Sequence, residues 1–122
     1  MRNHRVAVIP GDGIGLEVIE AGKQVLETLS QKSDDFQFKF EDFDWSSKRY
    51  LETGEYIPEG GLEKLSTFDA IYFGAVGSQE VPDHVSLWEL RLAICQGFDQ
   101  YANVRPARVL PGVNSRLKGA EK

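Results

Sequence analysis

The chain has 122 residues, of which 41% are hydrophobic and 27% are charged, and its formal net charge is −5. These values are ordinary for one globular domain, and the negative charge argues against a nucleic-acid-binding surface. The single cysteine, Cys95, excludes an internal disulfide and favours a reducing compartment. No apolar signal region or run of transmembrane length is present. We therefore expect a cytoplasmic protein with neither nucleic-acid nor membrane partners.

The first two elements follow from hydrophobic periodicity. Residues 4–9 are almost continuously apolar, which predicts a strand covered on both faces. Apolar residues then recur at helical spacing from about Ile14 to Gln31, which predicts a helix. We expect its buried face to be a single stripe formed by Ile14, Val18, Val25 and Leu29, with Gly22 between them.

The middle of the chain predicts short alternating elements. Phenylalanines at every second position from Phe36 to Phe40 predict a strand with one apolar face. A polar stretch offers an N-cap for a short helix over 47–53, which Gly54 can end. Pro58 fits the first turn of another short helix, to about Leu65. Residues 68–73 predict a further strand.

The last predicted helix begins with a capping-box pattern, Ser86 followed by Glu89, and ends at about Gln96. Leu87, Leu90 and Ile94 are expected on one face, with Arg91 and Cys95 on a neighbouring face. The residues after this helix are typical of extended backbone around Pro106 and then of a polar loop: 101–104, 108–110 and 114–122.

Strands alternating with helices predict an α/β fold with a partly parallel sheet flanked by helices. No domain boundary is visible within residues 1–122. Three or four strands alone would leave sheet edges exposed. We therefore expect the chain to be a single incomplete domain, the N-terminal portion of something larger.

The stretch Arg5–Gly15 predicts a strand, a tight turn with glycine at 11, 13 and 15, and a helix start. Such a turn lets backbone approach a ligand, and the helix start favours an anion. It is not the dinucleotide fingerprint, because Leu16 and Val18 stand where a third glycine is needed, and no Gly-Lys-Ser/Thr of a P-loop follows. A purely structural turn is the alternative.

Three charged side chains are candidates for binding. Arg105 could hold a carboxylate with its forked donors, against the alternative of a surface ion pair. Arg91 could do the same, or be a solvated helix arginine. Asp12 could orient the glycine loop, accept a ligand hydroxyl, or make an ordinary Asx turn. His4 and His84 lack partners at metal-binding spacing, so no metal site is predicted.

Three stretches together resemble the β-decarboxylating dehydrogenases, the family of isocitrate, 3-isopropylmalate, tartrate and D-malate dehydrogenases. Residues 8–18, Val-Ile-Pro-Gly-Asp-Gly-Ile-Gly-Leu-Glu-Val, are similar to its N-terminal signature. Residues 68–77 resemble its second signature and residues 98–106 its third. Similarity to the tartrate and D-malate members in particular lies in residues 44–46, 81–84, 86–88 and 98–101.

The resemblance implies the N-terminal part of an isopropylmalate dehydrogenase-like fold. It implies oxidation, with decarboxylation, of a malate-type 2-hydroxy acid such as D-malate or tartrate. The cofactor would be NAD, with NADP left open, and Mg²⁺ or Mn²⁺ would polarise the C2 oxygen. The intact enzyme would be a homodimer. The family's catalytic tyrosine and lysine, its metal-binding aspartates and its adenine-binding loop fall beyond residue 122.

The resemblance also implies roles for residues of this chain. Arg105 falls on a family arginine that holds a substrate carboxylate. The loop with Ile14 and the turn with Gly74, Ala75, Val76 and Gly77 would lie beside the cofactor. The helix starting at Ser86 would choose the variable part of the substrate, through Trp88, Arg91 and Leu92. No catalytic residue and no metal ligand is expected within this chain.

Two departures from the family pattern stand out. Leu16 replaces a usual proline, and Cys95 stands ten residues before Arg105, where the family has a second substrate arginine. Arg91, one turn earlier, is our candidate to replace that guanidinium. The competing hypothesis is a truncated, non-catalytic nucleotide- or anion-binding remnant. A generic Rossmann dinucleotide binder is a weaker third.

Overall fold

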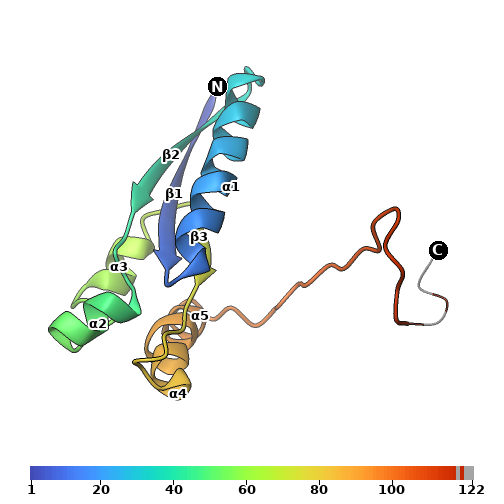
Figure 1. Ribbon diagram of the computed structural model, residues 1–122. Coiled ribbons are helices and arrows are strands. Elements are labelled where there is room, and N and C mark those ends of the chain that lie inside the picture. Colours follow the sequence, from blue (N-terminus) through green and yellow to red (C-terminus); the bar gives the residue numbers. More distant parts are fainter. Residues whose placement is uncertain (118, 120–122) are drawn as a thin grey trace.

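The computed structural model describes residues 1–117 and 119 (Figure 1). Its first half contains two long elements and then two short ones: β1 (Arg2–Gly11), α1 (Ile14–Gln31), β2 (Phe36–Asp42) and α2 (Ser47–Thr53). Its second half contains short elements only: α3 (Gly61–Leu65), β3 (Ala70–Ala75), α4 (Asp83–Ser86), η1 (Leu87–Leu92) and α5 (Ala93–Gly97).

The sheet of the described residues has the order β2-β1-β3, and both neighbours run parallel to β1. In its register Val6 stands between Phe40 and Ala70. The run from Val6 to Ile9 is buried, as expected for a central strand covered on both faces. Alternation along β1 sends Val6 and Val8 into one core cluster and Ala7 and Ile9 into the other. The predicted α/β fold is confirmed.

Helix α1 covers the face of the sheet that carries Val6 and Val8. The prediction of which large apolar residues of this helix are buried is wrong. Ile14, Val18, Val25 and Leu29 are 51–68% exposed, and the positions that face the sheet are Gly15, Ile19 and Gly22. Ile19 packs with Val6 and Val8, while a Cβ at Gly22 would overlap the Tyr72 hydroxyl. The helix approaches the sheet through its small residues, so its most apolar side points outward.

The other face of the sheet, which carries Ala7 and Ile9, packs against the larger core cluster, and the short helices contribute buried side chains to it. Helix α2 and its stop are confirmed, with Ser46 accepting at the N-cap and Gly54 in the left-handed region at φ 80°. The next helix begins at Gly61 and not at Pro58, whose carbonyl only closes the preceding turn. The strand predicted over 68–73 is displaced to β3, because the Phe68 amide donates to the Leu65 carbonyl in the turn that follows α3. The Phe68 ring packs edge-on against Phe43.

The helix predicted from Ser86 begins earlier and is not uniformly α-helical. It starts at Asp83, and the Ser86 hydroxyl donates to the Asp83 carbonyl, so the expected capping box does not form. The middle segment, η1, is a π-helix. Its wider turn leaves Leu87 37% exposed while Leu90 and Ile94 are buried, so the predicted common face holds for only two of the three residues.

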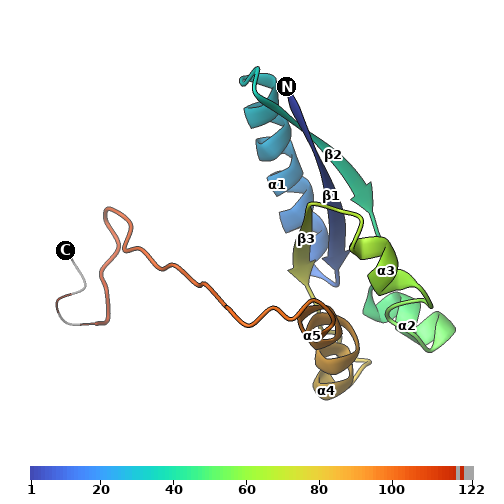
Figure 2. The same ribbon diagram turned by 180° about the vertical axis from the view of Figure 1, so that it is seen from behind.

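The described residues after Gly97 form neither helix nor strand, and they run away from the sheet in both views (Figures 1 and 2). The stretches 101–104 and 108–110 are therefore extended without joining the sheet. Residues 118 and 120–122, at the end of the expected polar loop, lie outside the described part. None of the described helices combines the length and apolar character that crossing a membrane requires.

Candidate active site

Two loops meet at the carboxyl ends of β1 and β3, where ligands gather in open parallel sheets. The Asp12 amide donates to the Ala75 carbonyl at 2.7 Å. A Cβ at Gly11 would overlap that same carbonyl oxygen, and one at Gly15 or Gly74 would overlap the Pro10 carbonyl oxygen. Glycine is therefore required because the two loops touch through their backbones.

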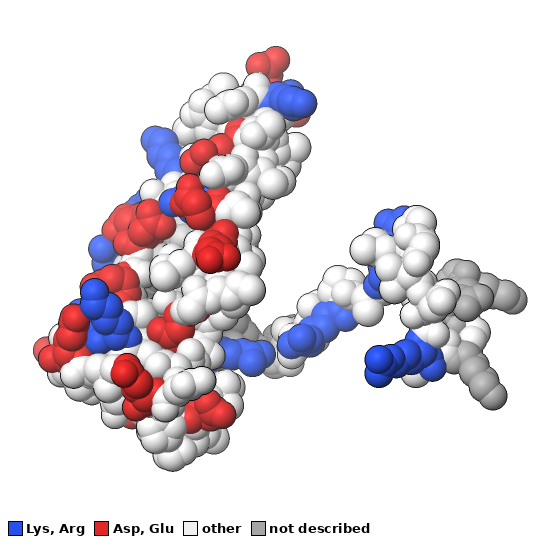
Figure 3. All heavy atoms as spheres, viewed as in Figure 1, with Lys and Arg blue, Asp and Glu red and all other residues white. Residues whose placement is uncertain are grey.

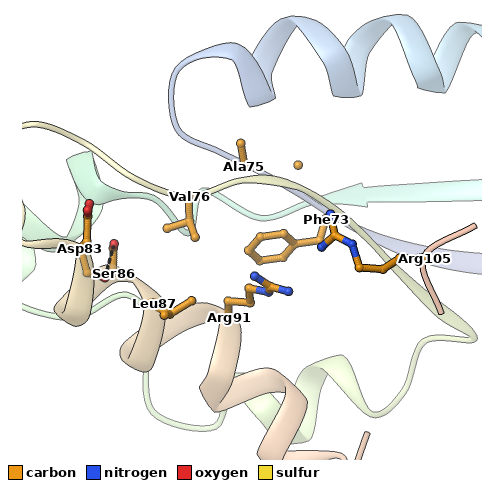
Figure 4. Close-up of a pocket in the computed structure, with 9 residues that line it drawn as sticks. Phe73, Ala75, Val76, Asp83, Ser86, Leu87, Arg91 and Arg105 are labelled. Carbon is orange, nitrogen blue, oxygen red and sulfur yellow. Dashed lines mark hydrogen bonds between the residues drawn. The ribbon is translucent and has the colours of Figure 1, made fainter. Parts of the chain in front are cut away.

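A pocket of about 640 Å³ opens beside this junction (Figure 4). We call it the arginine pocket, and its lining comes from β3 and the following loop, the helix that starts at Asp83, and the segment after α5. The residues that line it are Phe73, Gly74, Ala75, Val76, Asp83, Ser86, Leu87, Arg91 and Arg105.

The arginine pocket has a positive character. Figure 4 shows the side chains of Arg91 and Arg105 coming from different elements, with both guanidinium groups close to Phe73. Within residues 1–117 and 119, neither arginine takes part in an ion pair. Asp83 is the single acidic residue of the lining. Two guanidinium groups with free donors suit a ligand with more than one carboxylate.

The pocket unites part of the predicted site. Arg91, Arg105 and the predicted cofactor turn from Gly74 to Val76 all line it, although 14 to 31 residues separate them along the chain. The other predicted residues do not line it: Ile14, Gly77, Trp88 and Leu92. Ile14 and Trp88 are mostly exposed, and Leu92 is half-buried.

Gly77 lines a neighbouring hollow of about 510 Å³, together with Asp12, Gly13 and Ser47. Cys95, at the position of the expected family arginine, is half-buried and does not line the arginine pocket. Of these two positions on the helix, Arg91 lines the pocket and residue 95 does not.

Sequence reasoning missed four lining residues. Phe73 ends the strand that leads into the small-residue turn, and its position at a strand terminus was a usable signal. The sequence predicts a loop at Asp83, a helix cap at Ser86 and a buried face at Leu87. These three residues were missed because the predicted helix start lies three residues after the observed one. Proline directly before Asp83 is the signal that could have corrected that start.

A polar cluster joins the two loops to α2. Its Ser47 and Tyr56 are buried, whereas Asp12 is half-buried and Gly77 is exposed. The Asp12 carboxylate accepts from the Ser47 amide at 2.7 Å, the Ser47 hydroxyl at 2.6 Å and the Gly77 amide at 2.9 Å. The Ser47 oxygen lies 2.7 Å from the Tyr56 hydroxyl. We call these four residues the Asp12 network. The carboxylate binds the start of α2 and the loop after β3, so it does not make an Asx turn. A bond from Asp12 to a ligand hydroxyl stays a prediction.

Tyr56 is fully buried behind this network, and burial raises the pKa of its hydroxyl above the ordinary value of 10.0. The negative charges of Asp12 and Glu89 act in the same direction. The hydroxyl is therefore protonated at neutral pH and available as a donor.

The described residues differ in how well they fit the expected cofactors. They contain no group of three His, Cys, Asp or Glu side chains that could hold a metal ion. The turn from Gly74 to Val76 carries small side chains and faces the pocket, so a flat ring can lie against its backbone. These residues fit the nicotinamide half of a dinucleotide.

Charge is distributed unevenly along the chain. Figure 3 shows acidic and basic side chains interspersed on one face of the α/β body. Residues 100–117, the extended segment that contributes Arg105, contain three arginines and no acidic residue. Of these three arginines, Arg105 lines the arginine pocket and Arg108 and Arg116 do not.

Known proteins of related sequence are dehydrogenases. A probable tartrate dehydrogenase/decarboxylase of Agrobacterium vitis is 59% identical over 118 residues, which are 97% of this chain and 33% of that protein. The D-malate dehydrogenase [decarboxylating] of Escherichia coli is 46% identical, over 99% of this chain and 34% of its own length. The chain thus spans about a third of the length of these relatives.

A solved structure agrees with the sequence relatives. The apo β-decarboxylating dehydrogenase of Thermococcus kodakarensis superposes with a TM-score of 0.58 at 31% identity, over 80% of this chain and 27% of that one. The family model for isocitrate/isopropylmalate dehydrogenases matches residues 5–121. The glycine loop, the parallel sheet and these matches together show that the chain belongs to the isocitrate/isopropylmalate dehydrogenase family.

Proposed function

We propose that this chain is the substrate-binding N-terminal portion of a dehydrogenase that oxidises and decarboxylates a malate-type 2-hydroxy acid, such as D-malate or tartrate. The electron acceptor is NAD, and the reaction depends on Mg²⁺ or Mn²⁺ held by residues outside this chain. The names of the tartrate and D-malate relatives support this substrate class.

The observation that carries the proposal is the arginine pocket. Its two guanidinium groups, Arg91 and Arg105, come from different elements and face the same space beside the turn from Gly74 to Val76. A dicarboxylic acid held by both arginines would lie next to a cofactor ring packed on that turn. Oxidation requires this adjacency, because hydride passes directly from C2 of the acid to the nicotinamide.

Arg91 takes the role that the family gives to an arginine at position 95. The π-helical segment η1 carries Arg91 to the pocket wall, while Cys95, one turn later, lies outside the lining. Trp88 and Leu92 flank Arg91 on the same segment and are assigned to the variable end of the substrate. Ile14 and Gly77 are assigned to the cofactor side, next to the glycine loop.

The test begins with the full-length protein that contains this sequence. Its intact mass is measured first, and NAD reduction is then followed with D-malate or L-tartrate in the presence of Mn²⁺. We expect NADH formation with one of these acids and none after chelation of the metal. A protein that stays silent with every 2-hydroxy acid tested would overturn the proposal and favour a non-catalytic nucleotide- or anion-binding module.

The remaining parts of the proposal concern the intact enzyme. Homodimer formation, location in the cytoplasm and preference for NAD over NADP remain predictions, the second from composition and the other two from family resemblance. The assignment of residues 1–122 to a single incomplete domain is a prediction of the same kind. Sedimentation of the full-length protein and a comparison of the two cofactors would test the first and third.

A further inference from the structure

We propose that Asp12 is a positioning residue, which holds the loop after β3 in the conformation that the cofactor requires by binding the Gly77 amide and Ser47 at once. This inference rests on the proposed function, because it assigns a role toward the dinucleotide to a residue outside the arginine pocket.

The first support is the geometry of the carboxylate. Its two oxygens accept three hydrogen bonds of 2.6–2.9 Å, from the Ser47 amide, the Ser47 hydroxyl and the Gly77 amide. These partners lie 35 and 65 residues away along the chain. One side chain therefore joins the glycine loop, the start of α2 and the loop after β3. Bonds to a charged acceptor are the stronger class of hydrogen bond.

The second support is that the same residue binds the cofactor turn twice. The Asp12 amide donates to the Ala75 carbonyl at 2.7 Å, and the Asp12 carboxylate accepts from the Gly77 amide at 2.9 Å. Val76 between these two contacts lines the arginine pocket. Gly77 itself has a φ of 145°, so its backbone leaves the direction of β3 at this point. The turn is thus clamped on both sides of the residue that faces the ligand.

The third support is the direction of the proton donors behind Asp12. The Ser47 hydroxyl has one proton and donates it to the Asp12 carboxylate. The Tyr56 hydroxyl must then donate to the Ser47 oxygen, 2.7 Å away. Ser47 and Tyr56 are 2% and 1% exposed. A buried donor chain that ends on a carboxylate is reinforced along its length and resists rearrangement.

The experiment uses the full-length protein and the variant Asp12→Asn, with Asp34→Asn as the matched control. Asp34 is exposed in the turn before β2, so its variant makes the same charge change outside the network. Asparagine keeps the shape of Asp12 but replaces one acceptor by a donor. Because the Ser47 and Gly77 amides bind different oxygens of the carboxylate, one of these two amides then faces an N–H group and loses its hydrogen bond.

Two readouts are measured for each variant. First, we expect Asp12→Asn to speed amide hydrogen exchange in residues 75–81 and to leave exchange in β1 unchanged. Second, we expect this variant to raise KM for NAD about tenfold or more, while KM for the acid changes less than about twofold. Asp34→Asn should match the wild type in both. Ser47→Ala, which keeps the carboxylate and its bond to Gly77, should show the same pattern to a smaller extent and serves if Asp12→Asn does not fold.

The outcomes separate the two proposals. Unchanged exchange over 75–81, or an equal rise of both KM values, would overturn the role of Asp12. If the wild type reduces no cofactor, the proposed function fails, and the exchange measurement still decides whether Asp12 holds the loop.

Discussion

In the proposed function, Arg91 replaces the arginine that the family pattern has at position 95. Position 95, where the family pattern has an arginine, carries a half-buried cysteine that does not line the pocket. Arg91 lies one turn earlier and does line it, opposite Arg105. In the proposed function the pocket thus keeps two guanidinium groups, with a different spacing between them along the chain.

The arginine assignment predicts a selective loss of substrate binding. Arg91→Ala in the full-length enzyme should raise KM for the acid about 10- to 100-fold, because a hydrogen-bonded charge pair is lost. Arg91→Lys should recover part of the loss, since lysine lacks the fork. Arg108→Ala, an exposed arginine that does not line the pocket, is the control. Wild-type KM in Arg91→Ala would disprove the role.

Tyr56 predicts a loss of stability at high pH. Burial raises its pKa above 10.0, so the folded state keeps its proton more strongly than the unfolded state does. Its contribution to stability is therefore complete below pH 10.0 and is lost as pH rises through the folded-state pKa. Denaturant unfolding of the wild type and Tyr56→Phe between pH ~8 and pH ~11 tests this. An identical alkaline decline in both would contradict it.

At the scale of the element, helix α1 is positioned by its small residues. Gly15 and Gly22 lie against the β1–α1 loop and Tyr72, and Ile19 is the large side chain between them. Hydrophobic periodicity alone selected a different side of the same helix. Close approach of a helix to a sheet depends on where a Cβ does not fit, which periodicity does not record.

The close approach of α1 predicts the effect of a single methyl group. Gly22→Ala should destabilise the protein by about 1–3 kcal/mol, because the new Cβ overlaps the Tyr72 hydroxyl, although alanine favours helix. In a Tyr72→Phe background the loss should shrink, since that hydroxyl is absent. Denaturant unfolding measures both values. Equal losses in the two backgrounds would contradict the proposed contact.

The π-helical segment predicts unequal roles for two leucines that sequence periodicity places together. Leu90 is fully buried and Leu87 is 37% exposed. Leu90→Ala should lower the free energy of unfolding by about 2–5 kcal/mol, whereas Leu87→Ala should cost less than about 1 kcal/mol. Thermal or chemical unfolding of the two variants checks this. Equal losses would mean that the helix presents the regular α-helical face.

At the scale of the whole molecule, the described chain leaves an apolar side of α1 without cover. Ile14, Val18, Val25 and Leu29 are each at least half-exposed on that side. The sheet has only three strands, and β2 and β3 form its edges. A chain that spans a third of its relatives' length therefore exposes surfaces of the kind that proteins normally cover.

This exposure predicts the solution behaviour of the 122-residue chain when it is produced alone. We expect concentration-dependent self-association and binding of a hydrophobic dye, both reduced by Val25→Lys. Gln31→Lys, the same charge change at an exposed position outside the stripe, should have little effect. Analytical ultracentrifugation measures the association. A monomer that binds no dye at high concentration would contradict this expectation.

Local chemistry accounts for what could be predicted from the sequence. The bounds of α1 and α2, the stop at Gly54 and the buried character of β1 each depend on residues adjacent in the chain. Helix caps, glycines with left-handed backbone and apolar runs act over one or two helical turns, so they can be recognised from the sequence. The three motifs behind the family resemblance are local in the same sense.

Contacts between distant residues decided the rest. The partners of Asp12 depend on contacts between residues 35 and 65 positions apart in the chain. The buried side of α1 depends in the same way on distant contacts. The helix that starts at Asp83 owes its buried positions to its π-helical segment. Glycine at 11, 15, 22 and 74 permits these close contacts but does not specify which atoms make them. The sequence by itself thus determined the family, the three motifs that carry the family resemblance and the candidate arginines. Only the tertiary structure decided which of those residues share a pocket, because a pocket forms where separate segments pack together.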